Sequence, residues 1–248
     1  MTPAVGVAPR RRVLLTRSDE DNAEWAERLV EHGAEPVTLP CIHCEPIDTL
    51  ALRTDVAAAA ASADWLTFTS RRGVDAFASL HPSVPPRSRV AVVGAATADA
   101  ARARLGRVDL VGRDGTAASL GATLVRDGDL KRRPHVLLAL AENAGDTLER
   151  ALTAAGARCT RFDVYRTIPA PPAATKRAMS ALGADNVIFA SPTAVKGFVQ
   201  QVSVDVAVNV YTIGPSTSAA ARAAGLVVTA EAREPSLEGI LESMQWHR

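Results

Sequence analysis

Polar and small residues gather in five short segments that each follow a predicted strand. These segments are residues 16–19, 69–73, 94–97, 191–193 and 214–217, and they are rich in Ser, Thr, Gly and Arg. They contain no His or Cys, and their one carboxylate, Asp19, is a natural helix cap. Because ligands of parallel α/β sheets bind beyond the carboxyl ends of strands, we predict a site for a polyanion with little acid–base machinery. The competing interpretation is that each Ser or Thr only caps a helix.

The stretch 209–221 predicts a strand, a sharp turn and a helix start. Gly214 supplies backbone freedom for the turn, a proline suits the first helical position, and Ser216 or Thr217 can cap the alanine-rich helix. Such a helix start directs backbone N–H groups toward an anion.

The same pattern occurs earlier, at residues 90–102, with Gly94 on Gly214 and Thr97 on Thr217 at a constant offset of 120. Other elements repeat at offsets from 117 to 123, which places insertions in loops. Each copy is made of βα units, so we predict two similar α/β domains, each a parallel sheet covered by helices. The repeat by itself puts the joint near residue 130. The further elements expected are strands at 12–17, 136–138 and 157–168 and helices at 19–32, 73–80, 146–156 and 193–201.

Composition excludes several classes of protein. The net charge of +1 gives no field favouring nucleic acid, and no apolar run is long enough to span a membrane. Residues 1–9 indicate a disordered leader, and residues 13–15 are too short for a signal-peptide core, so we expect a cytoplasmic protein. Cys41, His43 and Cys44 have CxxC spacing, but a zinc site needs a second pair of ligands, so we expect no metal. Because no GxGxxG motif occurs, we expect no dinucleotide cofactor.

Taken together, the turns at Thr69-Ser70, 191–195 and 213–217, with Thr16-Arg17 and 164–167, resemble uroporphyrinogen-III synthase. The resemblance runs from about Val13 to Met244. It implies two α/β domains joined by two extended crossover segments, with the active site in a cleft between them. Domain one would be residues 1–38 plus 167–248, domain two residues 43–162, and the crossovers residues 37–44 and 161–168.

The resemblance also implies a reaction: hydroxymethylbilane, a linear tetrapyrrole with eight carboxylates, is cyclised to uroporphyrinogen III with loss of water and inversion of ring D. Tyr165 matches the family's tyrosine and would assist departure of the hydroxyl, although it could instead be a packed strand tyrosine. The substrate carboxylates would be bound by hydroxyls, backbone N–H groups and one guanidinium, from Arg17, Thr69, Ser70, Gly94, Thr97, Ser191, Gly214, Ser216 and Thr217. The enzyme would be a monomer without a cofactor.

Two segments depart from the family's pattern. Asp146 stands where many members have an arginine, and Arg71 and Arg72 follow Ser70. These extra arginines could replace the lost one in holding carboxylates, or they could simply be solvated. Two other functions stay open. One is a non-catalytic tetrapyrrole sensor or regulator of the same fold, and the other is a two-lobed binding protein for a different anionic small molecule.

Overall fold

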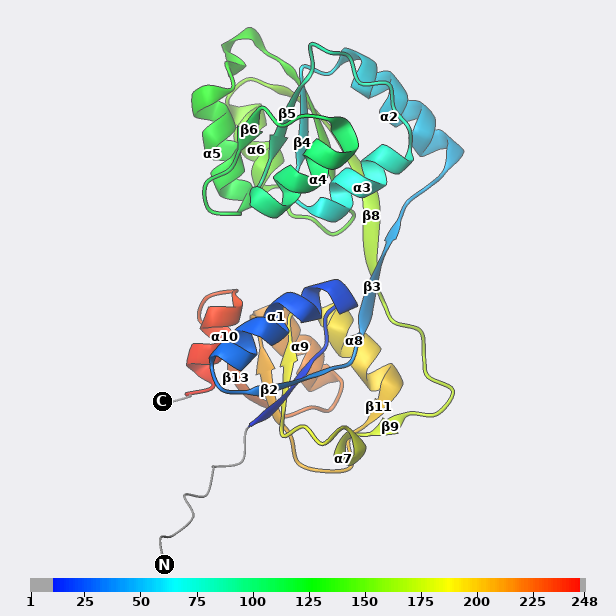
Figure 1. The fold of residues 1–248 in the computed structure, drawn as a ribbon, viewed down its shortest axis with the longest axis vertical. Coiled ribbons are helices and arrows are strands. Elements are labelled where there is room, and N and C mark those ends of the chain that lie inside the picture. Colours follow the sequence, from blue (N-terminus) through cyan, green and yellow to red (C-terminus); the bar gives the residue numbers. More distant parts are fainter. Residues whose placement is uncertain (1–10, 246–248) are drawn as a thin grey trace, which may run out of the picture. The chain divides into compact units, whose positions relative to one another are not determined.

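The computed structural model describes residues 11–245, which form two compact units (Figure 1). Unit 1 combines the chain up to His43 with the chain from Ile168 onward, and unit 2 is the continuous segment Cys44–Thr167. The segment near residue 130, where the repeat by itself put a joint, therefore lies inside unit 2. The leader expected at residues 1–9 lies outside the described residues.

Unit 1 is built on a five-stranded sheet in the order β13-β12-β10-β1-β2, with every pair parallel. Its strands are β1 (Arg12–Leu15), β2 (Glu35–Thr38), β10 (Asn186–Phe189), β12 (Asn209–Thr212) and β13 (Val228–Glu231). Its helices are α1 (Asp19–Glu31), α7 (Met179–Leu182), α8 (Pro192–Gln201), α9 (Pro215–Ala223) and α10 (Leu237–Ser243). A two-stranded sheet joins β9 (Arg177–Ala178) to β11 (Val202–Ser203).

Unit 2 is built on a six-stranded sheet in the order β3-β8-β7-β4-β5-β6. The strands of this sheet are β3 (Ile42–Pro46), β4 (Trp65–Phe68), β5 (Arg89–Val92), β6 (Leu110–Val111), β7 (His135–Ala141) and β8 (Arg158–Pro169). The first two residues of β3 and the last two of β8 belong to unit 1. Its helices are α2 (Leu50–Ser62), α3 (Arg71–Ser79), α4 (Ala95–Leu105), α5 (Ala117–Asp127), α6 (Thr147–Ala154) and the 3₁₀ helix η1 (Leu130–Arg132). Helix α2 is not among the elements that the sequence predicts.

Both sheets are buried on their two faces, because successive apolar side chains of a strand point to opposite sides. In unit 1, Leu14 joins the core under α8 and α9, while Val13 and Leu15 join the core under α1 and α10. In unit 2, α2, α3 and α4 cover one face, and α5 and α6 cover the other. The prediction of two parallel-sheet α/β halves is confirmed.

The duplication extends to the strand register. Arg12 pairs with Glu35 in unit 1, and His135 pairs with Arg158 in unit 2, both at the offset of 123 found in the sequence. One strand departs from the parallel pattern. Backbone bonds from Ile47 to Val164 and from Ala170 to Cys41 show that β3 runs antiparallel to β8.

Candidate active site

The sheet order brings the predicted turns together within each unit. In unit 1, β1, β10 and β12 are adjacent and parallel, so residues 16–19, 191–193 and 214–217 follow them at the same sheet edge. In unit 2, β4 and β5 are adjacent, so residues 69–73 and 94–97 lie at one edge, where β7 and β8 also end. Each unit therefore holds one group of the predicted residues.

Ser70 and Tyr165 are brought together although 95 positions separate them in the sequence. Ser70 is the N-cap of α3, and its Oγ accepts the backbone N–H of Gly73 at 3.0 Å. The same Oγ lies 2.9 Å from the hydroxyl of Tyr165. Thr69, which precedes Ser70, is half-buried. A phenol is thus held at the carboxyl edge of the unit 2 sheet.

A β-bulge in β8 determines which face of the sheet Tyr165 occupies. Leu140 of β7 pairs with Asp163 and Ala141 pairs with Tyr165, so β8 carries one extra residue, Val164, at this point. Regular alternation would put Val164 and Tyr165 on opposite faces, yet both pack against the core under α3. The bulge therefore turns Tyr165 toward the helix that Ser70 caps.

Ser191 is the unit 1 counterpart of Ser70 at an offset of 121. It is the N-cap of α8, and its Oγ accepts the backbone N–H of Ala194 at 3.1 Å. The counterpart of Tyr165 at the offset of 123 is Ile42, which is buried in the apolar core beneath α8. Unit 1 has the cap but carries no phenol at this position.

The helices α4 and α9 begin differently from the sequence prediction. Gly94 and Gly214 are their N-caps, and neither helix has a side-chain cap, so the prediction that Ser216 or Thr217 caps α9 is wrong. The reason is position: Ser216 and Thr217 already lie inside the first turn, too late to cap it. The backbone N–H groups of these first turns are consequently not occupied by a capping side chain.

The two glycines are not needed by the backbone. Gly94 and Gly214 have φ of −174° and 171°, extended values that any residue adopts, so the expected backbone freedom is not used. A Cβ on Gly214 would meet no atom within 4 Å, and one on Gly94 would meet only Gly115 at 3.6 Å. Their small size leaves open space in front of the first turns of α4 and α9.

Thr97 and Thr217 occupy the same place in these first turns. They are only 5% and 1% exposed, whereas Ser216 is exposed. Within residues 11–245, neither threonine hydroxyl has a hydrogen-bond partner. Although the two residues are mostly buried, neither hydroxyl oxygen is a fully buried atom without a partner, so both hydroxyls keep some contact with solvent and are available to a bound ligand.

Arg17 is engaged with its own helix. Its guanidinium lies 3.5 Å from the carboxylate of Asp21 and 4.4 Å from the ring centre of Trp25. Asn22, which the sequence pattern did not indicate, accepts the backbone N–H of Arg17 at 2.9 Å and donates to its carbonyl at 3.1 Å. These two hydrogen bonds to the backbone fix the turn after β1. The feature of the sequence that could have indicated them is an asparagine one turn into the helix.

The sequence also did not indicate a carboxylate close to α9. Ser218 is fully buried, lies 2.6 Å from the hydroxyl of Thr212 and donates to the carboxylate of Glu231. The corresponding unit 2 residues at the offset of 120 are Val92 and Ala98, which are apolar. The first turn of α9 is therefore braced by a polar chain, and that of α4 by apolar packing.

Residues 23–242 match the family model described as uroporphyrinogen-III synthase HemD. This chain belongs to the uroporphyrinogen-III synthase family. The activity of that family is that of a cyclising lyase in tetrapyrrole biosynthesis.

Individual relatives agree with the family assignment. The chain is 28% identical over 246 residues to the chloroplastic uroporphyrinogen-III synthase of Oryza sativa subsp. japonica, covering 95% of this chain and 80% of that protein. Its fold is similar to the crystal structure of uroporphyrinogen-III synthetase from Helicobacter pylori, with a TM-score of 0.59, 17% identity and coverage of 96% and 100%. A mutant uroporphyrinogen III synthase from Thermus thermophilus has a TM-score of 0.51, 18% identity and coverage of 95% and 97%.

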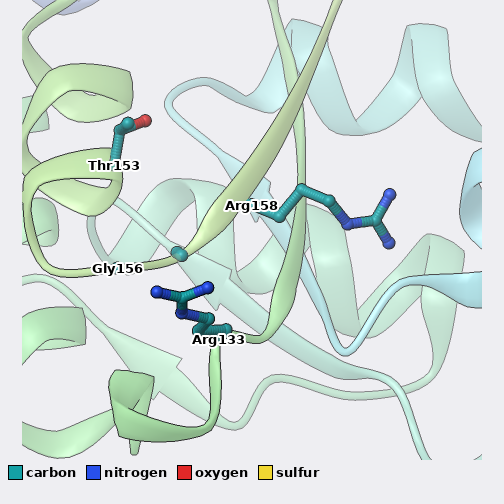
Figure 2. A pocket seen from close by; sticks show the side chains of 5 residues that line it. Arg133, Thr153, Gly156 and Arg158 are labelled. Carbon is teal, nitrogen blue, oxygen red and sulfur yellow. The ribbon is translucent and has the colours of Figure 1, made fainter.

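A pocket of about 360 Å³ lies away from the residues implied by the uroporphyrinogen-III synthase resemblance. It is lined by Arg133, Thr153, Gly156, Ala157 and Arg158, at the amino end of β8 and so at the opposite sheet edge from the turns. In Figure 2 the guanidinium groups of Arg133 and Arg158 point in different directions. They do not form a clamp for an anion in this arrangement.

The Cys and His side chains of the CxxC segment have different surroundings. The Cys41 thiol is buried and donates to the carbonyl of Leu39, and this burial raises its pKa to about 12. His43 is exposed, and Cys44 lies 3.4 Å from the hydroxyl of Thr167. Within residues 11–245, no three His, Cys, Asp or Glu side chains gather as a metal ion would require. In the same range, every helix is too short or too polar to cross a membrane.

Proposed function

We propose that this chain converts hydroxymethylbilane into uroporphyrinogen III, with loss of water and inversion of ring D, using Tyr165 as the residue that assists departure of the hydroxyl. The observation that carries this proposal is the 2.9 Å contact between the hydroxyls of Tyr165 and Ser70 at the carboxyl edge of the unit 2 sheet. We further infer that it works as a cytoplasmic monomer without a cofactor.

Tyr165 suits the first step because little acid strength is needed. The leaving hydroxyl takes a proton to become water, and the pyrrole nitrogen supplies the electron pair that stabilises the resulting azafulvene. A neutral phenol is protonated at physiological pH and can donate a hydrogen bond to the departing oxygen. The proton that the pyrrole nitrogen loses balances the one carried away in water.

The second requirement is control of geometry. The substituted carbon of ring D must attack the azafulvene carbon, giving a spiro intermediate whose rearrangement inverts the ring. Since an unguided chain closes without inversion, the main contribution of the protein is to hold the folded bilane in the reactive conformation.

The eight carboxylates of the substrate are the groups by which the protein can bind it. The uncapped first turns of α4 and α9 offer backbone N–H groups and a favourable dipole, and the open space at Gly94 and Gly214 lets a carboxylate approach them. The hydroxyls of Thr97 and Thr217 lie in the same turns. We propose that these groups, with Thr69, Ser191, Ser216 and Arg17, bind the acetate and propionate side chains.

A coupled assay tests the proposal. Freshly generated hydroxymethylbilane is supplied with the protein, and the oxidised products are separated into isomers I and III, of which isomer I forms spontaneously. Wild-type protein is expected to give mainly isomer III. Tyr165→Phe is expected to lower kcat about 100-fold, because a positioned proton donor contributes on that order.

Gly214→Ala extends the test to unit 1. Because the added Cβ meets no protein atom, the melting temperature should stay unchanged while KM rises through loss of room for a carboxylate. If only isomer I forms and the bilane still binds, the sensor function replaces the enzyme. If neither conversion nor binding is seen, the proposed ligand is wrong.

A further inference from the structure

We propose that Ser70 is a positioning residue for Tyr165: it donates its hydroxyl hydrogen to the phenol oxygen, so that the phenol hydrogen is directed to the leaving hydroxyl of the substrate. This role differs from the carboxylate binding that the family resemblance implies for Ser70. The kinetic part of its test rests on the proposed function, whereas the NMR part does not.

The hydrogen-bond inventory of Ser70 has room for donation in this direction. A serine hydroxyl has one hydrogen and two acceptor lone pairs, and Gly73 already donates to Ser70 Oγ at 3.0 Å. Donation from Ser70 to Tyr165 Oη, 2.9 Å away, then uses the serine hydrogen without leaving it unpaired. A hydroxyl that accepts a hydrogen bond is also a stronger donor of its own hydrogen, because hydrogen bonds in a chain polarise one another.

Packing holds both partners of this pair in place. The Val164 bulge puts the Tyr165 ring on the α3 face of the sheet. The ring lies against the first turn of α3, since its Cε1 atom is 3.8 Å from the place where a Cβ on Gly73 would stand. A Cβ there would also lie 3.0 Å from the carbonyl of Ala139, so α3 packs tightly on β7. The cap and the phenol are therefore both held by packing between α3 and the sheet of unit 2.

The first arm of the test is kinetic. Ser70→Gly removes the hydroxyl, and glycine is itself an acceptable N-cap, so this variant should fold even if Ser70→Ala does not. We expect kcat to fall about 10-fold with KM changed less than 2-fold, and Ser70→Thr to restore kcat. The double variant Ser70→Gly/Tyr165→Phe should be no slower than Tyr165→Phe, because Ser70 acts only through the phenol.

Ser236 provides the matched control for loss of a cap. It caps α10 in the same Ser-x-x-Gly arrangement, accepting the backbone N–H of Gly239 at 3.0 Å. Ser236→Ala should lower the melting temperature about as much as Ser70→Ala, with kcat unchanged. If Ser236→Ala lowers kcat equally, the effect of Ser70 is one of stability and the proposal is wrong.

The second arm does not depend on activity. The chain has two tyrosines, so labelling tyrosine with ¹³C at Cζ gives two NMR signals, and Tyr165→Phe identifies one of them. Ser70→Gly should shift the Tyr165 signal and leave that of Tyr211 in place, and Ser70→Thr should return it. An unmoved Tyr165 signal, a raised KM with unchanged kcat, or additive losses in the double variant would each overturn the proposal. If the wild-type protein forms no isomer III but Ser70→Gly still shifts the Tyr165 signal, the proposed function alone is rejected.

Discussion

Ser70 and Ser191 show how one duplicated scaffold came to hold two different environments. Both serines cap the helix after a buried strand, with φ and ψ of −161° and 156° for Ser70 and −165° and 157° for Ser191. The difference lies in the two segments that connect the units along the chain, where unit 2 has Tyr165 in β8 and unit 1 has Ile42 in β3, at the offset of 123. The local backbone is common to both copies, so the chemistry of each copy is set by the residue delivered from a distant strand.

The turns at Gly94 and Gly214 give the reverse comparison. Their helix starts are alike in backbone and in the buried threonine, but unit 1 supports its turn with Thr212, Ser218 and Glu231 where unit 2 uses apolar side chains. The helix start that we propose to bind a carboxylate is the same in both copies, and the side chains that support it differ. Both comparisons can be tested by exchanging residues between equivalent positions.

The largest expected effect concerns Gly197 and its unit 2 counterpart Ala76, at the offset of 121. A Cβ on Gly197 would collide with the backbone carbonyl of Cys41, which cannot move as a side chain can. Gly197→Ala should therefore cost about 3 kcal/mol of unfolding free energy, measured by urea denaturation. Ala76→Gly, the reverse exchange, should cost only about 1 kcal/mol from helix propensity. Equal costs would show that the two helices pack alike.

A smaller effect of opposite sign is expected at Thr67, whose unit 1 counterpart is Ile188. Thr67 is fully buried in β4, and within the described residues its hydroxyl has no hydrogen-bond partner. Thr67→Val keeps the shape and removes the unpaired hydroxyl, so it should stabilise the protein by about 1 kcal/mol. Thr67→Ser, which keeps the hydroxyl and loses a methyl group, is the control and should destabilise. A loss of stability in Thr67→Val would mean that the hydroxyl has a partner.

The smallest effect is a difference in pH dependence between His135 and its counterpart Arg12. Burial, and next the charge of Arg158, lower the pKa of His135 below its ordinary 6.5, while Asp64 and the contact with Ser62 act weakly the other way. The unfolded state then binds more protons than the folded state between that lowered pKa and 6.5. Stability is therefore full above about pH 6.5 and is lost as the pH falls below it.

His135→Gln should flatten this dependence. Glutamine can still bond to Ser62 and Thr160, which lie 3.1 and 2.9 Å from the imidazole nitrogens, but it does not titrate. Urea unfolding at pH 7.5 and pH 5.5 measures the change, and Arg12→Gln in unit 1 is the comparison, since arginine stays charged at both pH values. The same loss on acidification in wild type and His135→Gln would assign the dependence to other groups.

Local features of the molecule could be predicted from sequence, because their causes lie within a few residues. The strand at Val13 to Leu15 follows from its apolar residues, α1 from its acidic start and the glycine that ends it, and the five turns from their composition. The start of α9 was the local exception, since Pro215 and the two residues after it fit two alternative helix starts equally well. In the structure Gly214 has extended dihedral angles and is the N-cap, so the helix begins at Pro215.

Features that join distant segments could not be predicted in this way. The bulge at Val164 leaves no mark in a strand of β-prone residues, so alternation alone would turn Tyr165 away from Ser70. The bond between these two residues depends on the order of β4, β7 and β8 in the sheet. For Tyr165 itself, family resemblance supplied the expectation, and residue pattern alone left a packed tyrosine equally open.

The insertion of unit 2 into unit 1 also sets an order of events during synthesis. β10 lies between β1 and β12, but Leu15 and Asn186 are separated by 171 positions, which at ribosomal rates is roughly 10 to 30 s. All strands of unit 2 emerge within that interval. Meanwhile the nascent β1–α1–β2 segment exposes an unpaired strand edge and the apolar side chains of Val13 and Leu15. These must be prevented from associating with other chains. Chaperones should therefore bind newly made chains at the β1–α1–β2 segment, long before the second half of unit 1 has been synthesised.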